Sequence, residues 1–173
     1  AVEVRQSDLI VSNFMAGLMK PGSLTYRGNS KTNESGRNNF YFTTNSQGVQ
    51  PNITNGYAAQ AAPSAMITYQ ENLLILAEAG YRANGFDTGL ANLNNFRAYM
   101  NAGGYLTNAN ASNILYDAYS TADFVAGGIE NTDSINTEDA LLREILEERY
   151  ITLFGQIEVF NDTRRTENET VVR

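Results

Sequence analysis

The 173-residue chain contains neither cysteine nor histidine. Without cysteine it has no disulfide bonds, no thiol nucleophile and no thiolate metal ligand. Without histidine it has no Ser-His-Asp or Cys-His catalytic arrangement and no imidazole zinc site. These absences exclude the commonest hydrolytic chemistries. We expect no metal and no cofactor.

Positive charge and long apolar runs are also scarce. The net charge is −7, with 12 Lys and Arg against 19 Asp and Glu, which argues against the basic face that nucleic acids and anionic membranes bind, although Lys20, Arg27, Lys31 and Arg37 make the early loop region basic. The longest purely apolar run, residues 73–77, is far shorter than the roughly 20 residues that span a bilayer. The first residues lack the charged and apolar segments of a signal peptide. We expect no nucleic-acid partner, and any membrane anchor to lie outside this sequence.

Residues 1–62 are predicted to be loop-rich. A short helical pattern over residues 8–19 is followed by residues 21–62, which are rich in Gly, Asn, Ser and Thr and show no helical or strand period. Isolated aromatic residues are retained there, whereas disordered segments have few of them. We therefore interpret residues 21–62 as functional loops held by a scaffold.

A helical hairpin is predicted over residues 68–101. Thr68 and Glu71 have the spacing of a capping box, and the apolar residues that follow surround most of the first helix, which predicts a buried helix. Gly80 is small enough for a second helix to approach closely, and Gly85 predicts a left-handed helix end. The hairpin has the length of one tetratricopeptide-like unit.

The longest helical pattern covers residues 137–166, interrupted at Gly155. Its apolar stripe consists of Leu142, Ile145, Leu146 and Leu153, and Glu144, Glu147 and Glu148 fall on the opposite side of the helical wheel. Arg149 falls within the stripe, where an unpaired charge would cost several kcal/mol. The obvious acids to pair with it are Glu158 and Asp162, beyond Gly155. We predict that the chain folds back there and forms a structural ion pair.

Two acidic groups have neither catalytic nor metal-binding spacing. Glu147 and Glu148 are adjacent on a helix and point about 100° apart, so they cannot flank a sugar as the two carboxylates of a glycoside hydrolase do. Residues 133–139 lack the alternating ligands, central Gly and terminal Glu of a calcium loop. We therefore expect a non-catalytic protein.

Two segments resemble the SusD/RagB family of outer-membrane nutrient-binding lipoproteins. The first is TYQENLLILAEA at 68–79 with LANLNNFR at 90–97; the second is EILEERY at 144–150, FG at 154–155 and EVFNDTRRT at 158–166. The resemblance implies a mainly α fold of tetratricopeptide-like helical hairpins with long irregular loops. It also implies that residues 1–173 are the C-terminal portion of such a domain, with loop-rich residues 1–62, the hairpin at 68–101 and the helix and signature segment at 137–166.

The resemblance further implies a function at the cell surface. Family members bind a glycan, an oligosaccharide or another nutrient and deliver it to a SusC-like TonB-dependent transporter in the outer membrane, where a lipid holds them. Aromatic faces stack on sugars, and amide and guanidinium groups supply planar hydrogen bonds. Our candidate ligand-binding residues are Tyr26, Arg27, Asn38, Asn39 and Tyr41. The alternative is a helical-repeat module for protein–protein interaction without a small-molecule ligand.

Overall fold

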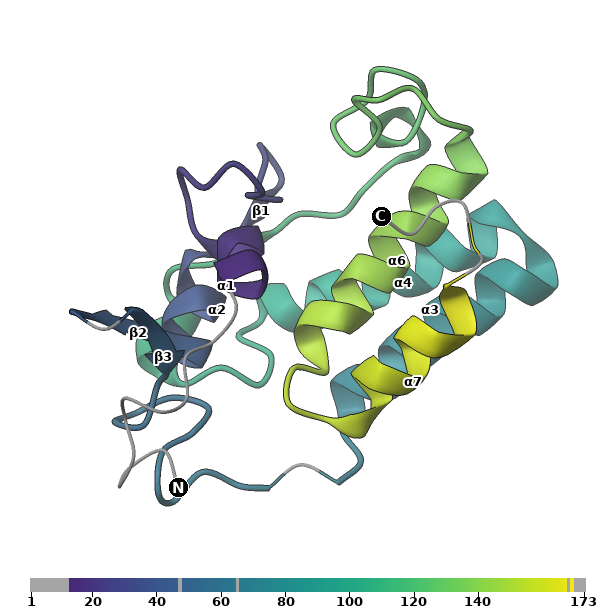
Figure 1. The fold of residues 1–173 in the computed structure, drawn as a ribbon. Helices are drawn as coiled ribbons and strands as arrows, with labels where there is room; N and C mark the ends of the chain where they lie inside the picture. The colour runs from purple at the N-terminus through teal and green to yellow at the C-terminus, as the bar shows by residue number, and fades with distance from the viewer. Residues whose placement is uncertain (1–12, 47, 65, 168, 170–173) are drawn as a thin grey trace. The chain divides into compact units, whose positions relative to one another are not determined.

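The computed structural model describes residues 13–46, 48–64, 66–167 and 169 and is mainly α-helical, which confirms the predicted fold class. Figure 1 shows the ribbon. The chain divides into two compact units. Unit 1 comprises Ala1–Ser64 and Met100–Asp117, and unit 2 comprises Ala65–Tyr99 and Ala118–Arg173.

Unit 1 is built from short elements. They are α1 (Asn13–Met19), β1 (Thr32–Asn33), α2 (Ser35–Tyr41), β2 (Phe42–Asn45), β3 (Gly48–Pro51), α5 (Asn108–Ala111) and β4 (Leu115–Tyr116). Strands β2 and β3 form an antiparallel hairpin, and β1 pairs antiparallel with β4. Residues 21–62, predicted to be loops, therefore contain a helix and a hairpin. These elements are too short to produce a periodic sequence pattern.

The core of unit 1 is where α1, α2 and the segment before β4 meet. Its buried apolar residues include Met15, Met19, Tyr41, Phe42, Leu106 and Tyr116. The Asn38 amide donates a hydrogen bond to the Ala16 carbonyl at 3.3 Å and so ties α2 to α1. The predicted helical pattern over residues 8–19 forms α1 from residue 13 onward, and its earlier part lies outside the described residues.

Unit 2 contains the long helices. They are α3 (Tyr69–Asn84), α4 (Phe86–Asn101, whose last two residues belong to unit 1), the 3-10 turn η1 (Thr121–Asp123), α6 (Thr137–Thr152) and α7 (Ile157–Thr166). Helix α6 packs against α3, and α7 follows α6 after Gly155, whose φ of 78° is a conformation that glycine adopts without strain. In Figure 1 the yellow α7 runs beside α3. None of the described helices is both long and apolar enough to cross a membrane.

The predicted hairpin is present as α3 and α4. The Glu71 amide donates to the Thr68 hydroxyl at 3.2 Å, and the Thr68 amide donates to the Glu71 carboxylate at 3.4 Å, so the capping box is confirmed. A Cβ on Gly80 would lie 2.6 Å from the Asn92 amide nitrogen, which confirms the close approach of α4. Gly85 ends α3 with φ 85°.

The apolar run predicted that helix α3 is buried around most of its circumference, and the structure shows that it is not. Leu73 and Leu74 face the core, but Ile75 and Leu76 are 45% and 47% exposed. The run 73–77 turns through more than one full helical turn, so its members cannot all face the same neighbour. The prediction was wrong because apolar character alone does not tell how many sides of a helix are covered.

Helix α6 is buried on more sides than its helical wheel predicted. Its predicted stripe is buried or half-buried, but Glu144 and Glu148 are buried as well. The Thr152 hydroxyl donates to Glu148 at 3.0 Å, and Glu144 lies 3.9 Å from the buried guanidinium of Arg97 in α4. Elements pack on more than one side of α6, so its acidic side is also internal.

Candidate functional site

Three aromatic side chains of unit 1 form a half-exposed cluster, which we call the aromatic surface: Phe40 in α2, Tyr57 after β3 and Tyr105 after α4. The ring centroids of Phe40 and Tyr105 are 5.8 Å apart, and those of Phe40 and Tyr57 are 6.5 Å apart, both edge to face. Tyr41 lies behind them, and its hydroxyl is 2.9 Å from that of Tyr105. Aromatic rings presented in this way can stack on apolar sugar faces.

The segment 52–57 holds Tyr57 against α2 through backbone contacts. The Tyr57 amide donates to the Phe40 carbonyl at 2.9 Å, and the Asn52 side-chain amide donates to the Asn39 carbonyl at 2.8 Å. A Cβ on Gly56 would lie 2.1 Å from the Phe40 carbonyl oxygen, so only glycine permits this approach. Backbone contacts, and not ring packing alone, therefore set the position of Tyr57 beside α2.

A buried charged network supports α2 from inside unit 1. The Glu34 carboxylate accepts hydrogen bonds from Arg37 Nε and Nη2, both at 2.9 Å, from Arg27 Nη1 at 3.2 Å and from the Tyr116 hydroxyl at 2.6 Å. The Arg37 guanidinium also lies over the Tyr116 ring, 5.4 Å from its centroid. A carboxylate with this many donors is well compensated for its burial. The network connects α2 to β4, which is far away in sequence.

The five predicted ligand-binding residues all lie in unit 1 but have different environments. Tyr26 is half-buried and its ring lies against Gly28, while Asn39 is exposed. Arg27, whose side chain is 6% exposed, bonds to Glu34, and Asn38 bonds to α1. Tyr41 is 1% exposed.

The burial of Tyr41, a candidate ligand-binding residue, leaves its ring no exposed face on which a sugar could stack. Burial, followed by the neighbouring charge of Tyr105, raises the pKa of the Tyr41 phenol well above its usual value. Its ring is 5.4 Å from Phe40 and 5.4 Å from Tyr57, so Tyr41 supports the aromatic surface from below. The sequence showed an aromatic residue in a polar stretch but not which of the neighbouring rings faces outward.

The predicted ion pair of Arg149 lies in unit 2. Arg149 Nε donates to Asp162 at 2.8 Å and Nη2 donates to the other oxygen of Asp162 at 3.1 Å, a two-pronged contact between α6 and α7. Glu158, the other predicted acid, forms no ion pair with Arg149 among the described residues. The second acid is instead Glu78 of α3, 3.4 Å from Arg149 Nε.

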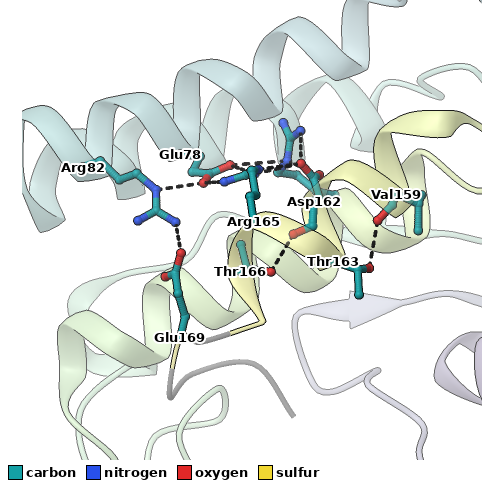
Figure 2. Close-up of polar contacts among 9 residues, drawn as sticks. Glu78, Arg82, Val159, Asp162, Thr163, Arg165, Thr166 and Glu169 are labelled. Carbon is teal, nitrogen blue, oxygen red and sulfur yellow. Dashed lines mark hydrogen bonds and ion pairs between the residues drawn. The ribbon is translucent and has the colours of Figure 1, made fainter.

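Arg149 belongs to a larger group that we call the ion-pair cluster, consisting of Glu78, Arg82, Arg149, Asp162, Arg165 and Glu169. Figure 2 shows Arg165 of α7 pointing at Glu78 and Asp162, and Arg82 placed between Glu78 and Glu169. Burial raises the pKa of Glu78, but hydrogen bonds from Arg165 and Arg82 and the charges of Arg165 and Arg149 outweigh it, so the net pKa is lowered. The cluster holds three helices together.

An open pocket of about 320 Å³ adjoins the ion-pair cluster. It is lined by Ile75, Glu78, Ala79, Arg82, Arg149 and Arg165. Its arginines already bond to acids of the cluster, and Arg149 Nη1 is shielded from solvent and has no hydrogen-bond partner among the described residues. The pocket therefore offers paired charges, which suit a structural clamp better than a ligand site.

The acidic residues of the described segments show no metal-binding arrangement, and one of the two adjacent glutamates is out of reach of a ligand. Glu148, one of the two adjacent glutamates on α6, is fully buried and bonded to Thr152, so a sugar cannot reach it. Among the residues that the structure describes, no group of three or more acidic side chains is placed to hold a metal ion.

Sequence reasoning missed the aromatic surface and the role of Glu78. Phe40 and Tyr57 were visible as aromatic residues in a polar stretch, but Tyr105 comes from a segment far along the chain. Glu78 was visible only as a charge at the end of an apolar run. Its position four residues after the buried Leu74, on the same face of the helix, is a weak signal that it faces inward.

Comparison with known proteins agrees with this architecture. No curated protein and no solved structure matches the chain. The model of the SusD family, SusD_RagB, matches residues 6–172, which is nearly the whole chain. The chain therefore belongs to the SusD family.

Proposed function

We propose that this protein binds a glycan, an oligosaccharide or another nutrient at the cell surface without transforming it. Membership of the SusD family supports this function, because proteins of that family are generally non-catalytic nutrient-binding proteins. The absence of cysteine and histidine is consistent with a binding protein. We further propose that the ligand passes to a SusC-like TonB-dependent transporter in the outer membrane.

The proposed ligand surface lies in unit 1. The observation that carries it is the aromatic surface, since Phe40, Tyr57 and Tyr105 are grouped and half-exposed, with Tyr57 joined to Phe40 by a backbone hydrogen bond and Tyr105 joined to Tyr41 through their hydroxyls. Tyr26 and Asn39 are proposed as further contacts. Arg27, Asn38 and Tyr41 would act from behind the surface, by fixing α2.

The proposed setting of the protein follows from its family. Proteins of the SusD family are generally outer-membrane lipoproteins. We propose that residues 1–173 are the C-terminal portion of such a protein and that a lipid outside these residues holds it at the outer membrane.

The function is tested by measuring glycan binding of the chain and of a ring-deleted variant. Tyr57→Ala should weaken binding by about 1–3 kcal/mol, or roughly 5- to 150-fold, because it removes a desolvated aromatic anchor. Tyr57→Phe, which keeps the ring and removes only the hydroxyl, should lose less affinity than Tyr57→Ala. Tyr69→Ala is the matched control, because Tyr69 is exposed on α3 in unit 2. Equal loss of affinity in Tyr57→Ala and Tyr69→Ala would contradict the proposed surface.

A second candidate function is a protein–protein interaction module without a small-molecule ligand. It is favoured by large apolar residues that are exposed on two helices of unit 2: Ile75 and Leu76 on α3, and Ile157 and Phe160 on α7. In this case Leu76→Asp and Phe160→Asp should each abolish capture of a partner protein, and Tyr57→Ala should leave that capture unchanged. A screen of glycans would find no ligand.

A further inference from the structure

The segments that carry the aromatic surface have no ionisable side chains other than tyrosine. Residues 38–70 and residues 98–116 contain no Asp, Glu, Lys or Arg. The first stretch includes Phe40 and Tyr57 and the whole β2–β3 hairpin, and the second includes Tyr105. These two segments therefore offer a ligand aromatic faces, amides, hydroxyls and backbone, all of which are neutral at physiological pH.

The two arginines nearest in sequence to α2 are withdrawn from this surface. The side chain of Arg37 is fully buried and that of Arg27 is 6% exposed. Both bond to Glu34, which Tyr116 also contacts from β4. A guanidinium that turned outward to a carboxylate or sulfate would deprive the buried Glu34 of one of its two cationic partners, which is unfavourable.

The charge of unit 1 is close to balanced. Unit 1 holds five Lys and Arg and four Asp and Glu, so the negative excess of the protein lies in unit 2, and no cation within 38–70 or 98–116 is available to hold a polyanion. Anionic polysaccharides are normally held by bidentate arginine contacts and by lysine, and the aromatic surface supplies neither.

From these observations we infer that the aromatic surface selects neutral glycans and rejects those that carry uronate or sulfate groups. This inference rests on the proposed glycan-binding function and adds the class of sugar. Stacking on neutral pyranose rings and hydrogen bonds from the Asn39 amide and the Tyr57 and Tyr105 hydroxyls would provide recognition. Burial raises the pKa of Tyr57, so its hydroxyl remains a neutral donor.

Affinity electrophoresis of the intact chain tests the inference. Neutral probes are mixed-linkage β-glucan, xylan and galactomannan, and the acidic probe is polygalacturonate, each at about 20 mM and about 200 mM NaCl, a range over which surface electrostatics become screened. At least one neutral polysaccharide should retard the protein, to the same extent at both salt concentrations, and polygalacturonate should not. Retardation by polygalacturonate equal to that by the neutral probes would overturn the inference but leave the proposed function standing. Absence of retardation by any polysaccharide would count against the proposed function itself.

A gain-of-function variant separates charge from shape. Asn39→Arg places a guanidinium beside Phe40 on the exposed side of α2. Polygalacturonate should then retard this variant, about tenfold more strongly at the lower salt concentration than at the higher one. Asn45→Arg, an identical change at the far end of the β2–β3 hairpin, is the matched control and should not create it. If Asn39→Arg gains no acidic binding, or if Asn45→Arg gains as much, charge at this surface does not set the specificity and the inference is wrong.

Discussion

Replacing Arg149 with alanine should destabilise unit 2 far more than replacing Arg165, although Arg165 makes more hydrogen bonds within the ion-pair cluster. Arg165 donates three, to Asp162 and to both oxygens of Glu78, whereas Arg149 donates two, both to Asp162. The difference that matters is burial. The side chain of Arg149 is 7% exposed and that of Arg165 is 39% exposed.

The magnitudes follow from the acids that each substitution leaves behind. Removing one partner of a buried ion pair costs about 3–5 kcal/mol. After loss of Arg149, Glu78 retains Arg82 and Arg165, and Asp162 retains Arg165, so we expect the lower end, about 3 kcal/mol. Loss of Arg165 removes a solvent-screened partner, and both acids keep Arg149, so we expect about 0.5–1 kcal/mol.

The assay is urea unfolding followed by far-UV circular dichroism, since the chain has no tryptophan and unit 2 holds its long helices. With an m-value of about 2 kcal/mol per M, the midpoint should fall by about 1.5 M in Arg149→Ala and by less than about 0.5 M in Arg165→Ala. Arg164→Ala is the control, because Arg164 is exposed and lies over the Phe160 ring; its midpoint should stay within about 0.25 M of the wild type. A midpoint for Arg165→Ala as low as that for Arg149→Ala would refute the argument from burial.

Four further outcomes are expected. Thr68→Ala removes one half of the capping box and should lower stability by about 1 kcal/mol in the same assay, whereas an unchanged midpoint would show that the cap contributes nothing. The net pKa of Glu78 is lowered below its ordinary value of 4.5 in the folded chain, so the stability that its charge contributes is present above that pH and lost as the pH falls through the lowered pKa. The difference in unfolding free energy between wild type and Glu78→Gln should therefore be full at pH 7 and shrink below pH 4.5. A difference that persists at low pH would exclude a charge effect. Tyr41→Ala should lower stability by about 3–5 kcal/mol, as expected for a buried aromatic, whereas Tyr26→Ala should leave the melting temperature unchanged and weaken ligand binding by about 1–3 kcal/mol.

Features set by neighbouring residues were predicted well from the sequence. The capping box at Thr68 depends on two side chains three residues apart, and Gly85 and Gly155 both adopt positive φ where a helix had to end. Arg149 was predicted to need an acid because a charge in an apolar stripe has few alternatives. In each case the physical cause lies within about one helical turn of the residue concerned, so the sequence contains it.

Features set by distant segments could not be predicted in this way. The two-residue strands β1 and β4 pair Thr32 with Tyr116, and neither strand has a detectable period. The burial of Glu144 depends on Arg97, which belongs to another helix. A helical wheel assigns one buried face, so it places such acids in solvent whenever a second helix covers them. The aromatic surface was missed for the same reason, because Tyr105 joins it only through the fold.

Each unit contains a buried carboxylate that accepts hydrogen bonds from arginines, and both arrangements join elements far apart in sequence. Glu34 connects α2 to Tyr116 of β4, and Glu78 connects α3 to Arg165 of α7. An apolar contact tolerates small shifts, but a buried charge that loses its partner costs several kcal/mol. We therefore expect these networks to exclude alternative packings of short elements that apolar burial alone would specify weakly. If so, the outward-facing parts of Phe40, Tyr57 and Tyr105 need not stabilise the fold, which leaves the aromatic surface open to change with the ligand.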